Sequence, residues 1–251
     1  MAVALGNARR AVDRGDLAAL GEGHPGRQQS GLAGDRPDPG APDVVPPPVL
    51  SRDYITFACF NNFVKVSPAI MKAWVSILSV VPHSRLLLKA QAYADESVRQ
   101  RVLATFEQNG VSRERIELLS VTRTVEEHLA HYQDVDIALD TYPYNGATTT
   151  CEALWMGVPV ITWRGETHAA RMGASILSAL GMTMFVTHSQ DHYVSTAVRT
   201  AANPRELVPL RVALRGLMKR SPLRAEFSHT RTLEKYYREC WQRFANDGVS
   251  A

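Results

Sequence analysis

Cysteine is scarce in this sequence. The three cysteines, Cys59, Cys151 and Cys240, lie far apart, and no Cys-x-x-Cys pair occurs. This spacing supports neither a zinc site nor a disulfide framework, so a reducing, cytoplasmic setting is the simpler interpretation. No apolar run approaches the roughly 20 residues of a membrane-spanning helix. The N-terminus also lacks the apolar core of a signal peptide, because Gly6 interrupts its first apolar residues.

Aromatic residues are absent from residues 1–50, which hold eight of the 16 glycines and seven of the 14 prolines. Such a segment buries too little apolar surface to offset the entropy lost on ordering. We therefore expect residues 1–50 to be a disordered or non-native segment, with a linker over 31–48. Residues 51–246 form the folded unit in this division, and 247–251 form a flexible tail.

The charge balance excludes one class of partner. The net charge is +3, and the basic residues are not gathered into a block, so nucleic-acid binding is not indicated. An apolar fraction of 45% and a charged fraction of 21% are ordinary for a soluble globular protein.

Beyond residue 50, apolar strand-like runs alternate with helix-like segments. The predicted strands are 54–60, 85–89, 115–119, 135–139 and 158–163. The predicted helices begin at Ser67-Pro68, Asp95 and the Thr124–Glu127 capping box, and continue with 148–157, 167–180, 190–202, 204–219 and 224–245. Repeated strand–helix units predict an α/β fold, a doubly wound parallel sheet with a helical C-terminal extension.

The most informative segment is Asp140–Thr150, which joins a predicted strand to a Thr-rich helix start. The first N–H groups of a helix have no intrahelical partner and lie at the positive end of its dipole. A phosphate group suits that position, and threonine hydroxyls add further donors. The segment therefore predicts a site for a phosphorylated ligand, with a nucleoside diphosphate as the first choice.

Further candidate residues follow the other strands at the same sheet edge, where ligands of such folds bind. Asn61, Asn62 and Lys65 follow the first strand, and Arg123 and His128 follow the third. Each also has an ordinary structural explanation. Lys65 alone would more often be an exposed loop lysine, the asparagines suit turns, and a surface histidine often pairs with a carboxylate.

The residues after the fourth strand carry the same ambiguity. Threonines such as Thr148 and Thr149 also serve as helix caps, but three in a row after Asn145-Gly146 favour a ligand site. The Glu152 carboxylate suits ribose hydroxyls, and equally suits the first turn of a helix.

Two other side chains leave their roles open. Arg171 either reaches a phosphate or braces its loop. His128 and His131 have a spacing that suits a metal, but no third ligand is evident, so we expect no metal site.

Together these motifs resemble the catalytic region of the O-GlcNAc transferase and SPINDLY family of protein O-glycosyltransferases, in particular its bacterial branch associated with tetratricopeptide repeats. The matching segments are 60–68, 126–128, 136–141, 145–150, 152–159 and 165–171. The resemblance covers about residues 50–245 and implies the C-terminal, nucleotide-sugar-binding lobe of a two-lobed (GT-B) enzyme. It implies inverting, metal-independent transfer of a sugar to Ser or Thr hydroxyls, with no cofactor beyond the donor.

The resemblance also assigns roles to individual residues. It implies that Lys65 stabilises the departing diphosphate beside Asn62, and that Thr148 and Thr149 hold the diphosphate. Glu152 would bind the ribose, and the Arg123 backbone and the His128 side chain would frame the nucleotide.

The donor is UDP-GlcNAc in our first reading and GDP-fucose in the second, because Ala147 and Val125 replace polar residues common in the family. The expected partners are a protein acceptor and an N-terminal catalytic lobe or tetratricopeptide-repeat protein outside this sequence. Two alternatives stay open, an inactive nucleotide-binding remnant and a nucleotide-sugar epimerase.

Overall fold

The computed structural model describes residues 40–247 and contains a six-stranded sheet within them. The strand order is β3-β2-β1-β4-β5-β6, and all neighbouring strands are parallel. The strands are β1 (Ile55–Cys59), β2 (Ser84–Lys89), β3 (Ile116–Leu119), β4 (Ile137–Leu139), β5 (Val160–Trp163) and β6 (Val186–Thr187). The doubly wound α/β prediction is confirmed. The sequence did not indicate β6, because two residues are too short to form a pattern.

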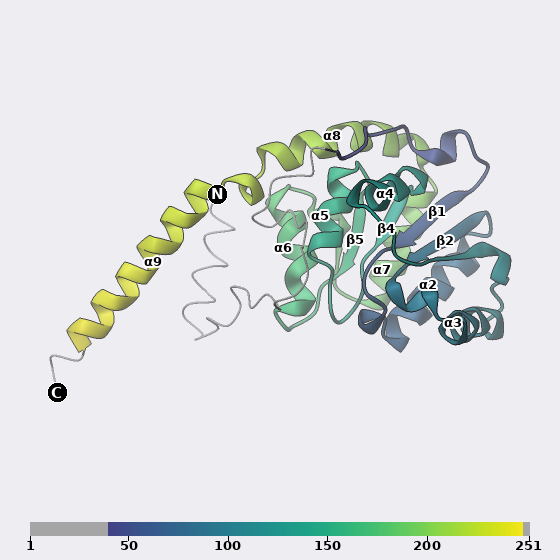
Figure 1. Cartoon of the computed structure of the whole chain (residues 1–251), viewed down its shortest axis with the longest axis horizontal. Coiled ribbons are helices and arrows are strands. Elements are labelled where there is room, and N and C mark those ends of the chain that lie inside the picture. The colour runs from purple at the N-terminus through teal and green to yellow at the C-terminus, as the bar shows by residue number, and fades with distance from the viewer. Residues whose placement is uncertain (1–39, 248–251) are drawn as a thin grey trace.

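Helices cover both faces of the sheet (Figure 1). The helices are α2 (Pro68–Val80), α3 (Glu96–Gln108), α4 (Val125–Ala130), α5 (Thr148–Trp155), α6 (Met172–Ala179), α7 (Gln190–Ala201), α8 (Leu207–Arg220) and α9 (Glu226–Asp247). Helix α2 packs against α7 on one face, and α5 packs against α8 on the other. The strands are therefore buried on both sides, as in other parallel sheets.

Side-chain caps start several helices where the sequence predicted them. The Ser67 hydroxyl accepts a hydrogen bond from Ile70 N, and the Thr124 hydroxyl accepts one from Glu127 N. One predicted helix begins later than expected. Its first residues, 167–171, form a loop and a short 3-10 turn, so α6 begins only at Met172.

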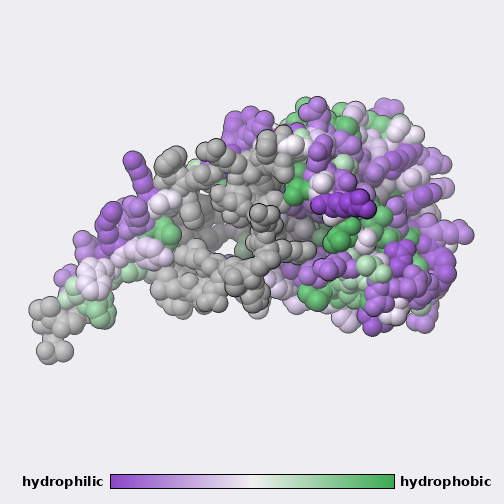
Figure 2. Space-filling model, viewed as in Figure 1, coloured by the Kyte–Doolittle hydropathy of each residue, from purple (hydrophilic) through white to green (hydrophobic). Residues whose placement is uncertain are grey.

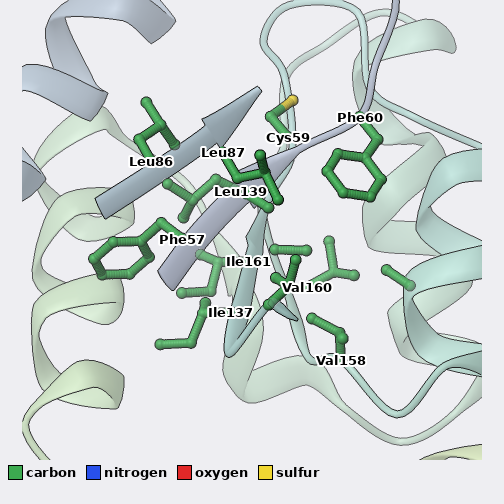
Figure 3. Close-up of a cluster of buried hydrophobic side chains, with 14 of the residues drawn as sticks. Phe57, Cys59, Phe60, Leu86, Leu87, Ile137, Leu139, Val158, Val160 and Ile161 are labelled. Atoms are coloured by element: carbon green, nitrogen blue, oxygen red, sulfur yellow. The ribbon is translucent and has the colours of Figure 1, made fainter. Parts of the chain in front are cut away.

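The core lies where side chains of neighbouring strands meet. Figure 3 shows Phe57 of β1, Leu86 of β2, Ile137 of β4 and Ile161 of β5 in one apolar cluster, and all four are fully buried. Burial of such side chains contributes roughly 1.5–3 kcal/mol each to stability. This core fixes the sheet and, with it, the strand ends that carry the candidate site.

The structure of residues 40–50 differs from the prediction made from the sequence. We expected a disordered linker there, but these residues lie against α8. Arg211 Nε of α8 donates a hydrogen bond to the Val45 carbonyl at 2.6 Å, and Arg215 Nη2 donates one to the Pro42 carbonyl at 2.6 Å. The arginine contacts satisfy two backbone carbonyls of this segment and hold it against α8 without aromatic side chains. The rest of the predicted disordered segment, 1–39, and most of the predicted tail, 248–251, lie outside the described residues.

The C-terminal helix α9 extends away from the sheet (Figure 1). Its aromatic residues Tyr237, Trp241 and Phe244 are exposed. The visible face of the sheet-containing body is largely hydrophilic, with scattered hydrophobic residues (Figure 2). None of the helices described between residues 40 and 247 combines the length and apolarity needed to cross a membrane.

Candidate functional site

The candidate residues converge between β1 and β4, where the strand order changes direction. From β1 the chain continues to β2 on one side, and from β4 it continues to β5 on the other. In open α/β sheets, ligands bind at such a point, in the crevice outside the carboxyl ends of the strands. Asn61 and Lys65 follow β1, and the Asp140–Ala147 loop follows β4. Hydrogen bonds join these two loops at the place where the crevice is expected.

The buried carboxylate of Asp140 organises the loop after β4. Its Oδ1 accepts hydrogen bonds from Thr141 N at 2.8 Å, Gly146 N at 2.7 Å and Asn61 Nδ2 at 3.1 Å. Its Oδ2 accepts one from Thr162 Oγ1 at 2.7 Å. These bonds join the loops after β1 and β4 to β5. The sequence motif contained Asp140, but its partners are distant in sequence, so we assigned it no role there.

Burial raises the pKa of Asp140 to about 6, although its four hydrogen bonds favour the ionised form. A folded-state pKa above the ordinary value of 3.8 means that protonation favours the folded state. The contribution of Asp140 to stability is therefore full below about pH 4 and is lost as the pH rises through about 6.

The Asp140→Asn variant isolates this titration, because an amide oxygen keeps the Oδ1 contacts and its nitrogen can donate to Thr162. We expect the stability of the wild type, relative to Asp140→Asn, to fall by about 1–3 kcal/mol between pH 4 and pH 7.5. Urea denaturation of both proteins across that range measures the difference. A difference that is constant with pH would show that the pKa of Asp140 is not raised.

Asn61 links the loop after β1 to the start of α5. Its Oδ1 accepts a hydrogen bond from Thr149 Oγ1 at 2.5 Å, and its Nδ2 donates to Thr141 Oγ1 at 3.0 Å. Gly146 lies directly against this pair. A Cβ added to Gly146 would stand 2.6 Å from Thr149 Oγ1 and 2.7 Å from Asn61 Oδ1. A glycine is therefore required where the two loops cross.

The Gly146→Ala variant should break the Asn61–Thr149 contact. We expect it to lower the free energy of unfolding by about 1–3 kcal/mol, as overpacking in a closed site does. Gly216→Ala is the matched control, because its Cβ would meet only the Arg220 guanidinium, at 3.4 Å or more, within α8. That variant should be stabilising by up to about 1 kcal/mol. Equal stability of the two variants in urea denaturation would contradict the close approach at Gly146.

Lys65 places a half-buried ammonium group against the loop that follows β4. Its Nζ donates to the Asn145 carbonyl at 3.1 Å and lies 4.1 Å from the centre of the Tyr144 ring. Burial lowers the pKa of Lys65, and the nearby Asp140 opposes that shift. Among the described residues, no carboxylate lies within ion-pair distance of this ammonium group. Such a cation is poised to pair with an anionic ligand.

Helix α5 begins beside Lys65 without a side-chain cap. Its N-cap residue is Ala147, and its first residues are Thr148 and Thr149. The Thr149 hydroxyl donates to Asn61, whereas the Thr148 hydroxyl has no hydrogen-bond partner among residues 40–247. The free N–H groups, the helix dipole and the Thr148 hydroxyl together suit a phosphate group.

A second polar group lies one turn further along α5, on the face that carries Thr148. His128 of α4 places Nε2 3.0 Å from Glu152 Oε2, and its Nδ1 lies 2.6 Å from Lys89 Nζ. Glu152 and Lys89 are both buried. We predicted His128 and Glu152 as site residues but not Lys89, which the sequence presented only as the last residue of a strand. The signal that could have identified Lys89 is its position: it is a charged residue at the end of a buried strand, at the sheet edge where ligands bind.

The remaining predicted residues contribute less to this geometry. The Asn145 side chain bonds the carbonyls of Thr141 and Trp163 and so braces the loop. Asn62 is exposed and caps the short turn at Phe63.

Two predicted arginines form no side-chain hydrogen bond or ion pair with the other described site residues. Arg123 is exposed, and its backbone N–H donates to Glu127. Arg171 is half-buried in the turn before α6, and no hydrogen bond or ion pair joins its side chain to the other described site residues. Their ligand roles stay predictions. No group of three or more His, Cys, Asp or Glu side chains within residues 40–247 is arranged to hold a metal ion.

Comparisons with known proteins match this architecture. The family model described as "Glycosyl transferase family 41" matches residues 48–233. A probable UDP-N-acetylglucosamine–peptide N-acetylglucosaminyltransferase SPINDLY of Solanum lycopersicum is 43% identical over 213 residues, which cover 85% of this chain and 23% of that protein. A UDP-N-acetylglucosamine–peptide N-acetylglucosaminyltransferase of Caenorhabditis elegans is 32% identical over 196 residues, or 78% of this chain and 17% of that protein.

A solved structure of similar fold is the K341M mutant of the Thermobaculum terrenum O-GlcNAc transferase. It has a TM-score of 0.76 and 34% sequence identity, and the match covers 84% of this chain and 39% of that one. The chain thus spans about a quarter of the length of the plant relatives that it matches. The family model covers most of the folded residues, including both loops of the crevice, and the chain belongs to glycosyl transferase family 41.

Proposed function

We propose that this chain is the donor-binding lobe of a protein O-glycosyltransferase. The observation that carries the proposal is the meeting of Lys65 with the uncapped start of α5 at the crevice between β1 and β4. A diphosphate in that place would pair with the Lys65 ammonium group and accept hydrogen bonds from the first N–H groups of α5. Thr148 offers a further hydroxyl donor.

The proposed reaction transfers the sugar to a Ser or Thr hydroxyl with inversion and without a metal. The acceptor hydroxyl oxygen forms a bond to the anomeric carbon and gives up its proton to a general base or to water, as the bond from that carbon to the diphosphate oxygen breaks. Negative charge then builds up on the departing nucleoside diphosphate. Lys65 and the α5 N-terminus stabilise that charge in a fixed orientation, which lowers the barrier. The acceptor must be positioned as well, and the residues described here supply the donor side of the site.

The nucleoside of the donor is proposed to lie toward His128 and Glu152. A carboxylate such as that of Glu152 accepts hydrogen bonds from ribose hydroxyls, and its Oε1 is not used by His128. UDP-GlcNAc is the donor that we propose first, because the relatives named above carry UDP-N-acetylglucosamine in their names. GDP-fucose is the alternative, and a protein acceptor is the proposed partner.

Calorimetric titration of the purified chain with UDP, UDP-GlcNAc, GDP and GDP-fucose tests the proposal. We expect saturable binding of one nucleoside diphosphate and of its sugar conjugate, with the preference for uridine. Selective binding of GDP would change the proposed donor from UDP-GlcNAc to GDP-fucose and would leave the proposed binding site unchanged. No binding of any of the four by a folded sample would overturn the donor-binding role. Incubation of the chain with a Ser/Thr peptide and the bound donor then separates an active transferase from a nucleotide-binding remnant.

A further inference from the structure

Lys89 lies behind the residues that are proposed to contact the nucleoside. It is the last residue of β2, it is only 6% exposed, and its Nζ lies 2.6 Å from His128 Nδ1. Thr122 Oγ1 is a second acceptor at 3.4 Å. Lys89 is thus linked to Glu152 through the ring of His128.

The hydrogen-bonding capacity of the Lys89 ammonium group determines which ring nitrogen of His128 carries the hydrogen. A lysine ammonium group has three donors and no acceptor, so His128 Nδ1 must present its lone pair. The hydrogen of a neutral imidazole then resides on Nε2, because the bond made by one ring nitrogen sets the state of the other. Nε2 is the nitrogen that faces Glu152 Oε2 at 3.0 Å. A hydrogen there is donated to the carboxylate, so all three side chains form one directed chain of hydrogen bonds.

The orientation of the Glu152 carboxylate depends on which ring nitrogen of His128 carries the hydrogen. With Nε2 as a donor, Glu152 Oε2 is held and Oε1 is left for the ligand. With the opposite tautomer, the lone pair of Nε2 would face a carboxylate oxygen, and the two groups would repel each other. Glu152 is buried within α5, so it has little room to find another partner. The electrostatic influence of Glu152 on Lys89 opposes the lowering of the lysine pKa that burial causes.

We propose that Lys89 is a positioning residue that holds His128 in the Nε2–H tautomer and thereby presets Glu152 for the ribose hydroxyls of the donor. The tautomer itself follows from the contacts between the three side chains. Its consequence for ligand binding rests on the proposed function, and the test treats the two parts separately.

The first readout is the protonation pattern of His128 in the full chain. Long-range ¹H–¹⁵N correlation spectra distinguish a protonated from an unprotonated ring nitrogen, and a His128→Gln variant identifies the signals. We expect Nε2 protonated and Nδ1 unprotonated in the wild type. In Lys89→Met, Glu152 still accepts from Nε2 and no donor faces Nδ1, so we expect a population in which both ring nitrogens are protonated. In Lys89→Arg, which restores a donor, we expect the wild-type pattern. A protonated Nδ1 in the wild type would overturn the proposal, as would the wild-type pattern in Lys89→Met.

The second readout is the affinity for the nucleoside diphosphate that the wild type binds, UDP or GDP, measured by calorimetry. We expect Lys89→Met to bind roughly 10-fold more weakly, because one oriented hydrogen-bonded group is lost. Lys89→Arg should recover most of that loss. Lys72→Met, at a lysine of α2, is the control and should bind as the wild type does.

The outcomes separate the two parts of the proposal. If the protonation pattern of His128 changes in Lys89→Met while the affinity stays at the wild-type value, the positioning role at the ligand is wrong. If the wild type binds neither UDP nor GDP, the proposed function fails, and the spectra still decide the Lys89–His128 part. If Lys89→Met does not fold, the wild-type and Lys89→Arg spectra decide it.

Discussion

Replacement of Lys65 with alanine should weaken nucleoside diphosphate binding by about 10- to 100-fold. Hydrogen bonds to charged groups contribute about 1.5–3 kcal/mol, which corresponds to this range. Among residues 40–247, the Lys65 ammonium group donates to the Asn145 carbonyl and lies over the exposed Tyr144 ring, and it forms no ion pair, so we expect the fold to persist. Calorimetric titration of the variant and the wild type with the same nucleotide measures the loss.

Two controls sharpen this prediction. Lys72→Ala removes another lysine and should leave the affinity unchanged. Lys65→Arg keeps a cation at the crevice, so it should bind more tightly than Lys65→Ala. If Lys65→Ala has the affinity and the melting temperature of the wild type, Lys65 does not contribute to diphosphate binding.

The second large effect concerns stability and comes from Arg211. This side chain is 1% exposed and donates to three backbone carbonyls, those of Val45 at 2.6 Å, Val135 at 2.5 Å and Tyr132 at 3.0 Å. Burial lowers the pKa of Arg211 to about 10, which still leaves it charged at neutral pH. Its guanidinium group therefore ties residues before β1 to the start of β4.

The Arg211→Met variant should lower the free energy of unfolding by about 3–5 kcal/mol, because it leaves buried carbonyls without donors and leaves Arg52 as the remaining positive charge that acts on Asp136. Arg205→Met is the control, since Arg205 is exposed, and it should change stability by less than about 0.5 kcal/mol. Urea denaturation of both variants at neutral pH makes the comparison. A loss below about 1 kcal/mol in Arg211→Met would show that the carbonyls find other donors.

The sequence predicted the sheet because its central strands are continuous apolar runs that helices bury from both sides. It also predicted that several candidate site residues would lie at one sheet edge, because Lys65 and the Thr148 helix start each follow a strand. Carboxyl ends of parallel strands share one edge, so chain order alone brings such residues together. His128 and Glu152 were predicted on the same reasoning, and the structure places them in contact.

Other features depend on partners that the local sequence does not contain. The role inferred for Lys89 depends on its contact with His128, 39 positions later. The role of Asp140 depends on its hydrogen bond with Asn61, 79 positions earlier. The ordering of residues 40–50 depends on Arg211, which lies 166 positions beyond Val45. Composition favoured disorder in that segment, and a tertiary contact overrides composition when it satisfies the backbone.

The central claim is that a nucleoside diphosphate binds at the start of α5. The most direct measurement is the set of backbone amide ¹H–¹⁵N shifts of the full chain during titration with UDP and with GDP. The account predicts saturable shifts for the amides of residues 147–150, at the helix start, with smaller changes at the opposite sheet edge. Unshifted amides at 147–150 in a folded sample that contains saturating nucleotide would contradict it.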